Sequence, residues 1–402
     1  MLTDPYRRFL ALAGIVFAAL VATSIAFCVY VDPYRMYGTD RIPNKPQIYA
    51  QAALAKAYML ERVRPDTLIL GNEAVEMGLD PANQDWPDVP KPAFNAAGAD
   101  VDVFMAWRLL QHDIAAKPPQ FVILGLDFLD FVKANTEHGV EPKRDGEARL
   151  LVGRDGKPND SRSVQLWIDF FATTLSRQAI ADSIKTFRLR NTSSAPTMSE
   201  FGFNPSRGYE TVLHASGAEA VFSHNDASYR AQYRASLLSY FYSPSRNPQF
   251  RALANIVKLA KENDIRLILY IPPYHSRYLE IVHETGFWAG FEGWKRALVR
   301  TVDDAAGNRR DLVLLYDFSG YDDISGERVP PPGDTQAEMR WYRDSTHYTP
   351  ALGSLMIASM MAGSPVLGQE LNDATLESDL ARVRRDRDRL FAPLDADVET
   401  GN

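Results

Sequence analysis

Five short apolar runs alternate with segments of helical periodicity, and this alternation constrains the fold more than any other feature of the sequence. The runs span residues 67–70, 93–97, 121–128, 266–271 and 312–318. Each has the length of a strand and lies near glycine, proline or charged residues that interrupt strands. Strands that alternate with helices are joined by right-handed crossovers. The sequence therefore predicts an α/β fold, a three-layer sandwich around a five-stranded parallel sheet.

The segments around these runs are predicted to be helices, except for one long interruption. The predicted helices span residues 46–62, 101–116, 248–263, 278–304 and 349–361. From residue 132 to residue 247 the alternation stops, which predicts an insertion. Within it, one or two helices are expected at residues 164–189 and a loop at 192–208. Residues 228–242 are dense in tyrosine and serine, so they either form an aromatic packing face or help to cover a site.

Charge and cysteine content exclude several kinds of function. The formal net charge is -7 and no basic stripe precedes the last predicted helix, whereas nucleic-acid binding requires a concentrated basic surface. The single cysteine, Cys28, leaves no internal disulfide and no cysteine metal cluster. The sequence has no phosphate-binding loop, zinc-protease motif or Gly-x-Ser-x-Gly elbow. We therefore expect no nucleic-acid partner, no cofactor and no metal site.

An uncharged run at residues 9–31 predicts a transmembrane anchor. It is longer than the roughly 20 residues that a helix needs to cross a hydrocarbon core of about 30 Å. Arg7 and Arg8 precede it, so the positive-inside rule places the short N-terminus in the cytoplasm and the rest outside. A cleaved signal peptide is the alternative, because residues 24–26 are similar to a cleavage site. The apolar run continues beyond that site, which favours an uncleaved anchor with Cys28 buried in the membrane.

These features divide the chain into five parts. The last part contains a charged helix at residues 376–390, whose arginines are expected to form a solvated face rather than a binding surface. The parts are a cytoplasmic N-terminus at 1–8, the anchor at 9–31, a neck and first helix at 32–62, the α/β domain at 63–368 with its insertion at 132–247, and the charged helix and tail at 369–402.

The first candidate site follows the first predicted strand. Gly71 ends the apolar run, and Asn72 and Glu73 come directly after it. In an open parallel sheet the turn after the first strand lies at the carboxyl edge, where ligands bind. Asn72 and Glu73 are therefore expected to face a site.

The second candidate is the motif Asp344-Ser-Thr-His347, which directly precedes a predicted helix. An Asp-x-x-His loop can deliver an imidazole together with the carboxylate that orients it, as hydrolases with a nucleophilic serine require. The alternative is structural, with Asp344 or the serine capping the helix and His347 packed beside it.

The stretch from Gly71 to Gly78 resembles the first sequence block of the SGNH hydrolases, a broad family of esterases and acyltransferases. In the membrane-anchored bacterial branch, Gly-x-Ser-Arg is followed by residues like Val-Glu-Met-Gly, and this chain reads Gly-Asn-Glu-Ala-Val-Glu-Met-Gly. Glu73 thus stands at the place of the nucleophilic serine and Ala74 at that of the arginine. The resemblance implies the flavodoxin-like SGNH fold.

The motif that ends at His347 resembles the last block of the same family. By this resemblance His347 is the general base and Asp344 fixes its tautomer. Three further stretches, at residues 94–98, 122–128 and 271–277, are similar to the same branch.

The resemblance also implies candidates for oxyanion and substrate binding. In SGNH enzymes a backbone amide beside the nucleophile, a glycine and an asparagine stabilise the oxyanion. Gly98 matches the glycine, and Asn95 is a weaker candidate for the asparagine. The family's Gly-x-Asn-Asp block is not recognisable, and Asp127 stands where it is expected. His275 and Arg277 follow a strand and either bind an anionic or sugar group or pack at the surface. The candidates for oxyanion or substrate binding are therefore Gly71, Gly98, Asn95, Asp127, His275 and Arg277.

The function that the resemblance implies depends on Glu73. Similar proteins of alginate O-acetylation and of teichoic acid D-alanyl transfer work beside a multi-spanning membrane O-acyltransferase. We therefore expect a protein of the bacterial inner membrane whose periplasmic domain takes part in O-acylation or deacylation of a cell-surface polysaccharide. A carboxylate cannot form an ordinary serine ester, so this chain is expected to be a pseudoenzyme. The alternatives are that Glu73 works with His347 as an acid/base pair, or that the chain is a non-catalytic envelope structural or binding protein with the same fold.

Overall fold

The computed structural model describes residues 4–39, 41–43, 45–46, 52–84, 86–87, 89–133, 144–192, 198–236, 246–362 and 367–391. The chain forms two compact units, and each is built from separated parts of the sequence. The membrane unit comprises residues 1–63 and 143–200, and the sheet unit comprises residues 64–142 and 201–402.

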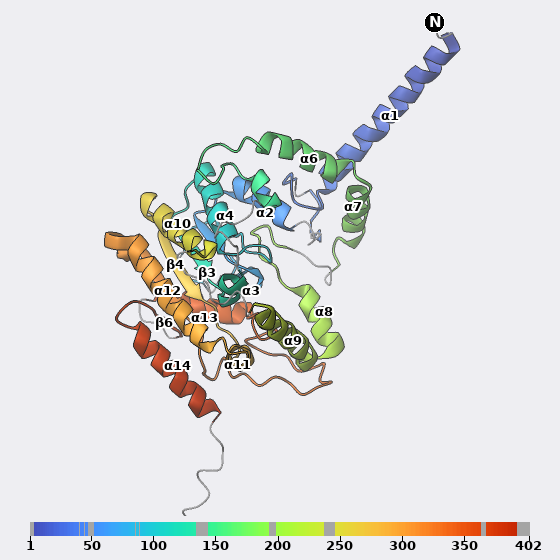
Figure 1. Cartoon of the computed structure of the whole chain (residues 1–402). Coiled ribbons are helices and arrows are strands. Elements are labelled where there is room, and N and C mark those ends of the chain that lie inside the picture. The colour runs from blue at the N-terminus through green and yellow to red at the C-terminus, as the bar shows by residue number, and fades with distance from the viewer. Residues whose placement is uncertain are drawn as a thin grey trace, which may run out of the picture. The chain divides into compact units, whose positions relative to one another are not determined.

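The sheet unit is an α/β fold on one mixed sheet of six strands (Figure 1). The strands are β1 Thr67–Leu70, β2 Ala93–Asn95, β3 Phe121–Gly125, β4 Arg266–Ile271, β5 Val313–Asp317 and β6 Gln369–Glu370. Their spatial order is β2-β1-β3-β4-β5-β6, with β6 antiparallel to β5 and all other pairs parallel. The α/β class is confirmed, but the predicted number of five strands is wrong. The sixth strand escapes prediction because it is two polar residues long.

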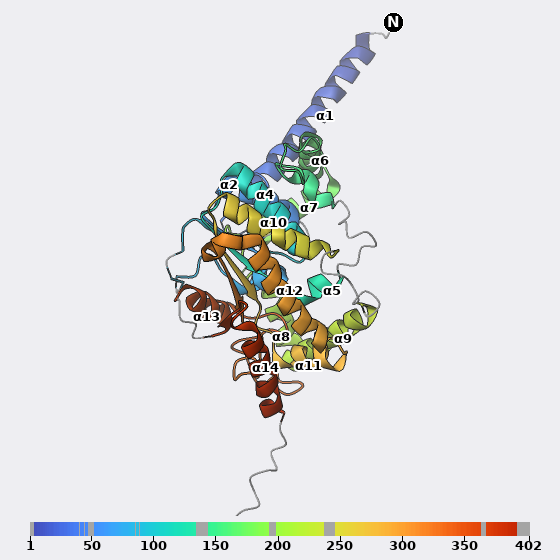
Figure 2. The ribbon, with the colours of Figure 1, turned by 60° about the vertical axis from the view of Figure 1, so that its left-hand side comes forward.

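The helices of the sheet unit cover both faces of the sheet. They are α3 Glu73–Gly78, α4 Val103–Ala116, α5 Phe128–Lys133, α8 Arg207–Ser216, α9 Ala218–Ser236, α10 Pro248–Glu262, α11 Ser276–Glu284, α12 Trp288–Ala306, α13 Pro350–Met361 and α14 Leu376–Leu390, with a 3₁₀ helix at Gly307–Leu312. One face carries α4, α10 and α12, and the other carries α3 and α13 (Figure 2). The predicted helix at 278–304 is in fact two helices, because Gly286 adopts a φ of +81° between α11 and α12.

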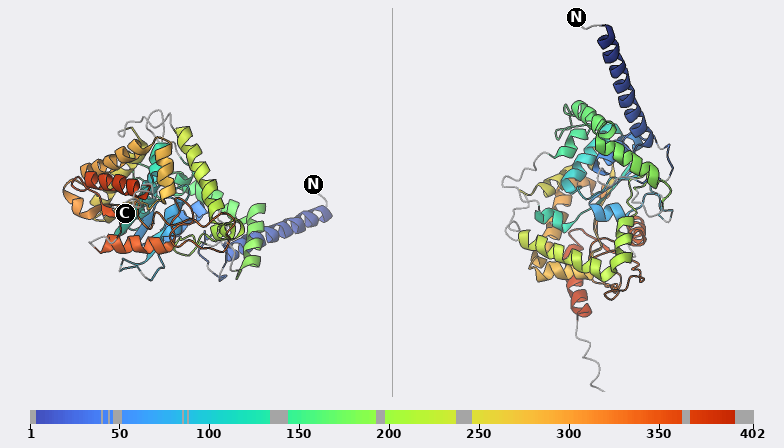
Figure 3. Two further views of the ribbon diagram at one scale, coloured as in Figure 1. Left: turned by 90° about the horizontal axis from the view of Figure 1, so that it is seen from below. Right: turned by 90° about the vertical axis from the view of Figure 1, so that its right-hand side faces the viewer.

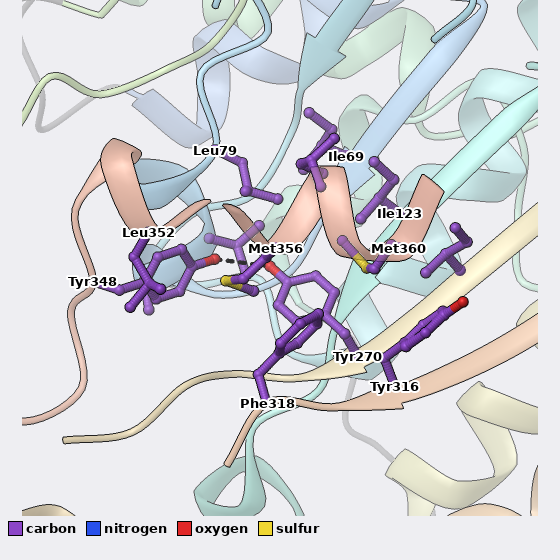
Figure 4. Packing of buried hydrophobic residues seen from close by; sticks show 14 of the residues in the cluster. Ile69, Leu79, Ile123, Tyr270, Tyr316, Phe318, Tyr348, Leu352, Met356 and Met360 are labelled. Atoms are coloured by element: carbon purple, nitrogen blue, oxygen red, sulfur yellow. Dashed lines mark hydrogen bonds between the residues drawn. The ribbon is translucent and has the colours of Figure 1, made fainter. Parts of the chain in front are cut away.

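Large apolar side chains fill the layer between the sheet and α13 (Figure 4). Ile69, Ile123 and Ile268 lie at matching positions on β1, β3 and β4, so they form a continuous row. Met356 and Met360 of α13 pack onto this layer and are buried. Neighbouring strand residues point to the opposite face, where they are also buried. Strands buried on both faces read as uninterrupted apolar runs, which is why the sequence identifies them.

The membrane unit is organised around α1 Asp4–Val31, with α2 Ala52–Val63, α6 Arg162–Thr174, α7 Arg177–Leu189 and a 3₁₀ helix at Asp145–Arg149. By length and composition, α1 can cross a membrane. Figure 3 shows α6 and α7 beside its C-terminal end. Cys28 is fully buried there in a cluster with Tyr34, Tyr58 and Ala179. At this end of α1, Cys28 therefore packs against protein side chains.

The predicted insertion is divided between the two units. Residues 143–200 belong to the membrane unit and contain α6 and α7, which account for the helical segment expected at 164–189. Residues 201–247 belong to the sheet unit and contain α8 and α9. Neither helix is predicted from the sequence, although the tyrosine-dense stretch at 228–242 includes the end of α9.

The charged C-terminal helix is attached to the rest of the sheet unit through its arginines. Arg387 of α14 forms an ion pair with Glu280 of α11 at 2.7 Å. Arg384 forms another with Glu292 of α12. The arginines thus dock the helix, whereas the sequence predicts only a solvated face.

Candidate functional site

The turn after β1 is shaped by a glycine and an asparagine. Gly71 has a φ of +142°, and a Cβ atom at this position would lie 2.5 Å from Cγ2 of Val75. Asn72 caps α3, since its Oδ1 accepts a hydrogen bond from the backbone N–H of Ala74 at 3.1 Å. The turn therefore presents Glu73 as the first residue of α3, at the carboxyl edge of the sheet.

The loop before α13 is folded around the fully buried carboxylate of Asp344. Its Oδ1 accepts hydrogen bonds from the backbone N–H groups of Thr346 at 2.8 Å and His347 at 2.9 Å. Its Oδ2 lies 2.7 Å from Nδ1 of His347. A single carboxylate thus fixes both the conformation of the loop and the orientation of the imidazole.

Glu73 and His347 meet although they are far apart in the sequence. Oε1 of Glu73 lies 3.1 Å from Nε2 of His347. The side chain of His347 is 3% exposed, whereas that of Glu73 is 45% exposed. Asp344, His347 and Glu73 therefore form a line from the buried interior to the surface. This is the arrangement of a Ser-His-Asp triad with a carboxylate in the place of the hydroxyl.

The two carboxylates control the charge of His347. Burial by itself lowers the pKa of His347, but Asp344 and Glu73 outweigh burial and raise this pKa to about 10. Burial likewise raises the pKa of Asp344, but the imidazolium and the surrounding donors outweigh it and hold this pKa well below its usual range. At neutral pH the ring is therefore an imidazolium that donates from both nitrogens, to Asp344 and to Glu73.

Two further side chains, both missed by the sequence analysis, complete the surroundings of Asp344. The hydroxyl of Tyr209 in α8 donates to Oδ2 of Asp344 at 2.7 Å, and Nδ2 of Asn225 in α9 donates to the same oxygen at 2.6 Å. Tyr209 lies just beyond a predicted loop and Asn225 lies in no motif, so no sequence signal marked them. The tyrosine-dense stretch did mark Tyr229, which hydrogen-bonds the histidine loop at 2.6 Å.

The predicted oxyanion donors are engaged inside the fold. The backbone N–H of Gly98 donates to the carbonyl of Gly71 at 3.0 Å. The side chain of Asn95 is fully buried, and its Nδ2 donates to the carbonyls of Val75 at 3.0 Å and Leu79 at 2.8 Å. These groups hold β2 and α3 around the β1 turn rather than pointing a donor at the site.

Asp127 lies beside the candidate site and orients it indirectly. It follows β3, and its Oδ1 accepts a hydrogen bond from the backbone N–H of Leu129 at 2.8 Å. Its Oδ2 accepts a hydrogen bond from Nδ2 of Asn72 at 3.0 Å. Asp127 therefore fixes the residue that caps α3, and with it the position of Glu73.

His275 and Arg277 support the histidine loop from the end of β4. The backbone N–H of His275 donates to the carbonyl of Ser345 at 3.0 Å, and its ring caps α11. Arg277 forms ion pairs with Glu219 and Asp226 at 2.7 Å each. Asp226 in turn accepts a hydrogen bond from the hydroxyl of Ser345. Both predicted binding residues thus hold the loop that carries the histidine.

A cavity of about 380 Å³ lies between α8 and α9. This volume is in the range of small-ligand sites, roughly 300–1,000 Å³. The cavity shares two residues with the network around Asp344 and is otherwise largely apolar. Its lining includes Tyr209, Val212, Val221, His224 and Asn225.

No protein-family model matches the sequence, and no curated protein matches it. Among the residues that the structure describes, no group of three or more His, Cys, Asp or Glu side chains is placed to hold a metal ion.

Proposed function

We propose that the protein is a membrane-anchored, extracytoplasmic protein of the SGNH-hydrolase type that takes part in O-acylation or deacylation of a cell-surface polysaccharide. Its role is to bind the polysaccharide beside a multi-spanning membrane O-acyltransferase, and serine-type catalysis is impaired. The doubly wound order of the parallel strands supports this, as does the meeting of the β1 turn with an Asp-x-x-His loop at one edge. The apolar helix α1 supports a membrane anchor.

The observation that carries the proposal is the contact between Glu73 and His347. A general base must accept a proton at the nitrogen that faces the nucleophile. Here Nε2 lies 3.1 Å from the carboxylate of Glu73, and a pKa of about 10 keeps it protonated at neutral pH. The carboxylate also cannot take the part of a serine hydroxyl. Glu73 thus removes both the nucleophile and the proton acceptor of the serine mechanism.

The same arrangement suits carbohydrate binding. The side chain of Glu73 is 45% exposed and is oriented by the buried imidazolium, so its carboxylate oxygens can accept hydrogen bonds from sugar hydroxyls. The cavity beside Tyr209 and Asn225 offers the apolar surface that an acyl substituent requires.

A second candidate is acid/base catalysis by the pair itself. The hydrogen bond between Glu73 and His347 and the exposure of Glu73 favour it, because a substrate can reach the carboxylate. The imidazolium is then the acid and Glu73 the base. This candidate requires the unmodified chain to hydrolyse esters in a way that depends on His347.

Ester hydrolysis separates the two candidates. The full chain in detergent is compared with His347→Ala, with Glu73→Ser, with Glu73→Ser plus Ala74→Arg, and with Glu73→Ser plus His347→Ala, using p-nitrophenyl acetate. We expect no activity above background for the chain itself, some for Glu73→Ser, more with Ala74→Arg, and none with His347→Ala. The restored activity should be low, because the loss of one oxyanion donor typically costs about 10²–10³ in rate.

Two outcomes would contradict the proposal. Hydrolysis by the unmodified chain that disappears in His347→Ala would establish the acid/base pair. An inactive Glu73→Ser variant that unfolds at the same temperature as the parent would show that Glu73 is not what prevents serine catalysis.

Binding is tested with a panel of O-acetylated bacterial polysaccharides and their chemically deacetylated forms. We expect the full chain in detergent to bind at least one acetylated form in preference to its deacetylated partner. Val212 lines the cavity, whereas Glu73 and His347 do not, so Val212→Trp is expected to narrow the cavity and to remove this preference. Equal binding of both forms, or no binding to any, contradicts the proposed role.

A further inference from the structure

The helix α6 reverses the usual pattern of an amphipathic helix. In a globular protein the apolar stripe faces the core and the polar face meets water. In α6 the residues Val164, Trp167, Ile168 and Phe171 follow the spacing i, i+3, i+4, i+7 and are 50–64% exposed. A continuous stripe of large apolar side chains, the α6 stripe, therefore lies on the open side of the helix.

The inward face of α6 is polar, and its hydrogen bonds fix the rotation of the helix. Asp169 is buried and accepts hydrogen bonds from Nε of Arg149 and the hydroxyl of Tyr58, each at 2.7 Å. The hydroxyls of Thr173 and Tyr37 are 2.7 Å apart. Turning the α6 stripe inward would break these buried hydrogen bonds, which is costly. The outward orientation of the stripe is thus part of the fold.

The helix α6 is attached to α1 within the length that crosses the membrane. The hydroxyl of Ser24 donates to the carbonyl of Thr174, the last residue of α6, at 2.8 Å. A helix that enters the hydrocarbon just after Arg8 needs roughly 20 residues, at about 1.5 Å each, to cross it. Ser24 therefore lies before the far boundary of the span. The hydrogen bond to Ser24 holds the end of α6 at that level of α1, and Figures 1 and 3 show α6 beside the C-terminal part of α1.

The helix α7 extends this surface and adds positive charge. Its inward residue Asp182 accepts a hydrogen bond from the hydroxyl of Tyr34 at 2.6 Å. Ile184 and Phe187 are each 39% exposed. All exposed charged side chains of the helix and its C-cap are cations, namely Arg177, Lys185, Arg188 and Arg190. Exposed apolar residues beside lysine and arginine are typical of helices that lie in a membrane interface.

We propose that α6 and α7 lie on the membrane that α1 crosses. The α6 stripe enters the boundary between headgroups and acyl chains, and the cations of α7 meet anionic headgroups. The occupant is lipid because the stripe joins a helix long and apolar enough to cross a membrane and because the exposed charges of α7 are all positive. This inference concerns the membrane unit alone and does not depend on the function proposed for the site.

The test uses fluorescence quenching of Trp167 by brominated lipid. Among the described residues, Trp167 is the exposed tryptophan, at 64%. Its emission is obtained by subtracting the spectrum of Trp167→Phe from that of the full chain. The full chain is reconstituted into vesicles of phosphatidylcholine and phosphatidylglycerol. We expect acyl chains brominated near the headgroup to remove most of this emission, and chains brominated near the methyl end to remove less. The control Trp341→Phe removes a tryptophan of the sheet unit and should leave the quenching unchanged.

Three results would overturn the proposal. Quenching by aqueous iodide but not by brominated lipid would place the α6 stripe in water. Resistance to both quenchers would show that protein covers it, either a second copy or a helix of another membrane protein. Equal lipid quenching of the parent and Trp167→Phe would show that the signal comes from another tryptophan.

Discussion

At the scale of single residues, Glu73 determines the charge of the site as well as its chemistry. A histidine with one carboxylate partner keeps a nitrogen that can accept a proton from a nucleophile. Here His347 has two carboxylate partners, at 2.7 Å and 3.1 Å, so the imidazolium is the stable form at neutral pH. The carboxylate of Glu73 therefore makes His347 a fixed cation rather than a proton acceptor.

Removing the negative charge of Glu73 should lower the pKa of His347. We predict that Glu73→Gln brings this pKa down from about 10 toward 6.5, but not to it, because Asp344 remains. The measurement is an NMR titration of the full chain with labelled histidine. His275 is the internal control, since burial lowers its pKa and no hydrogen bond joins it to Glu73. An unchanged pKa of His347 would show that Asp344 alone sustains the shift.

The raised pKa of His347 also predicts how stability varies with pH. The folded pKa lies above the unfolded value, so the folded state binds the proton more tightly. This contribution to stability is fully present below about 6.5 and is lost as the pH rises through about 10. The thermal midpoint should therefore fall over that range. Each unit by which Glu73→Gln lowers the pKa of His347 should reduce the loss of unfolding free energy across the range by about 1.4 kcal/mol. Parallel curves for the two proteins would contradict this prediction.

At the scale of elements, the sequence identifies the strands that are buried on both faces and misses a helix that contacts the candidate site from a distant part of the chain. The strands β3 and β4 are buried on both faces, so their apolar runs are unmistakable. By contrast, α8 has no buried residue, and no helix is predicted there from the sequence. The helix nevertheless supplies Tyr209 to the candidate site. The predicted strands are thus the elements with buried apolar side chains, whereas the helix that contributes Tyr209 through a polar contact is not predicted.

Replacing Gly71 in the β1 turn by alanine should reduce stability far more than the same change at Gly98, whose N–H donates to the carbonyl of Gly71. Gly71→Ala combines a positive φ with a contact of 2.5 Å to Val75, and we predict a loss of about 1–3 kcal/mol in unfolding free energy. The matched control is Gly98→Ala, where the nearest atom to a new Cβ is 3.8 Å away. Its cost should be below about 1 kcal/mol. Urea unfolding of the two variants tests the difference, and equal losses would refute the strain at Gly71.

At the scale of the whole molecule, the sequence predicts the anchor and the sheet but not the division into two units. The motifs around Glu73 and His347 are short and local, so the order of the amino acids is enough to recognise them. The contact of Ser24 with Thr174 spans 150 positions and has no local signature. The helices α6 and α7 of the insertion therefore look like an excursion from the α/β domain, although they complete the unit that contains α1.

The topology of the chain follows from the same helix. Because Arg7 and Arg8 precede the uncharged run of α1, we predict that the C-terminus lies outside the cytoplasm and that the full-length chain stays in the membrane. Alkaline phosphatase fused to the C-terminus should be active, and the protein should sediment with membranes. A soluble form that begins near Phe27 would contradict the prediction. Such a form would also lack most of α1.

The separation of 150 residues between the two ends of the Ser24 contact has a consequence for biosynthesis. At typical translation rates α6 emerges roughly 8–30 s after the part of α1 that it covers. During that interval α1 has time to be delivered to the bilayer, while the side chains that will contact α6 and α7 are still uncovered. The order of synthesis thus allows α1 to insert into the bilayer first. The helices α6 and α7 then pack last, against a helix that already spans the membrane.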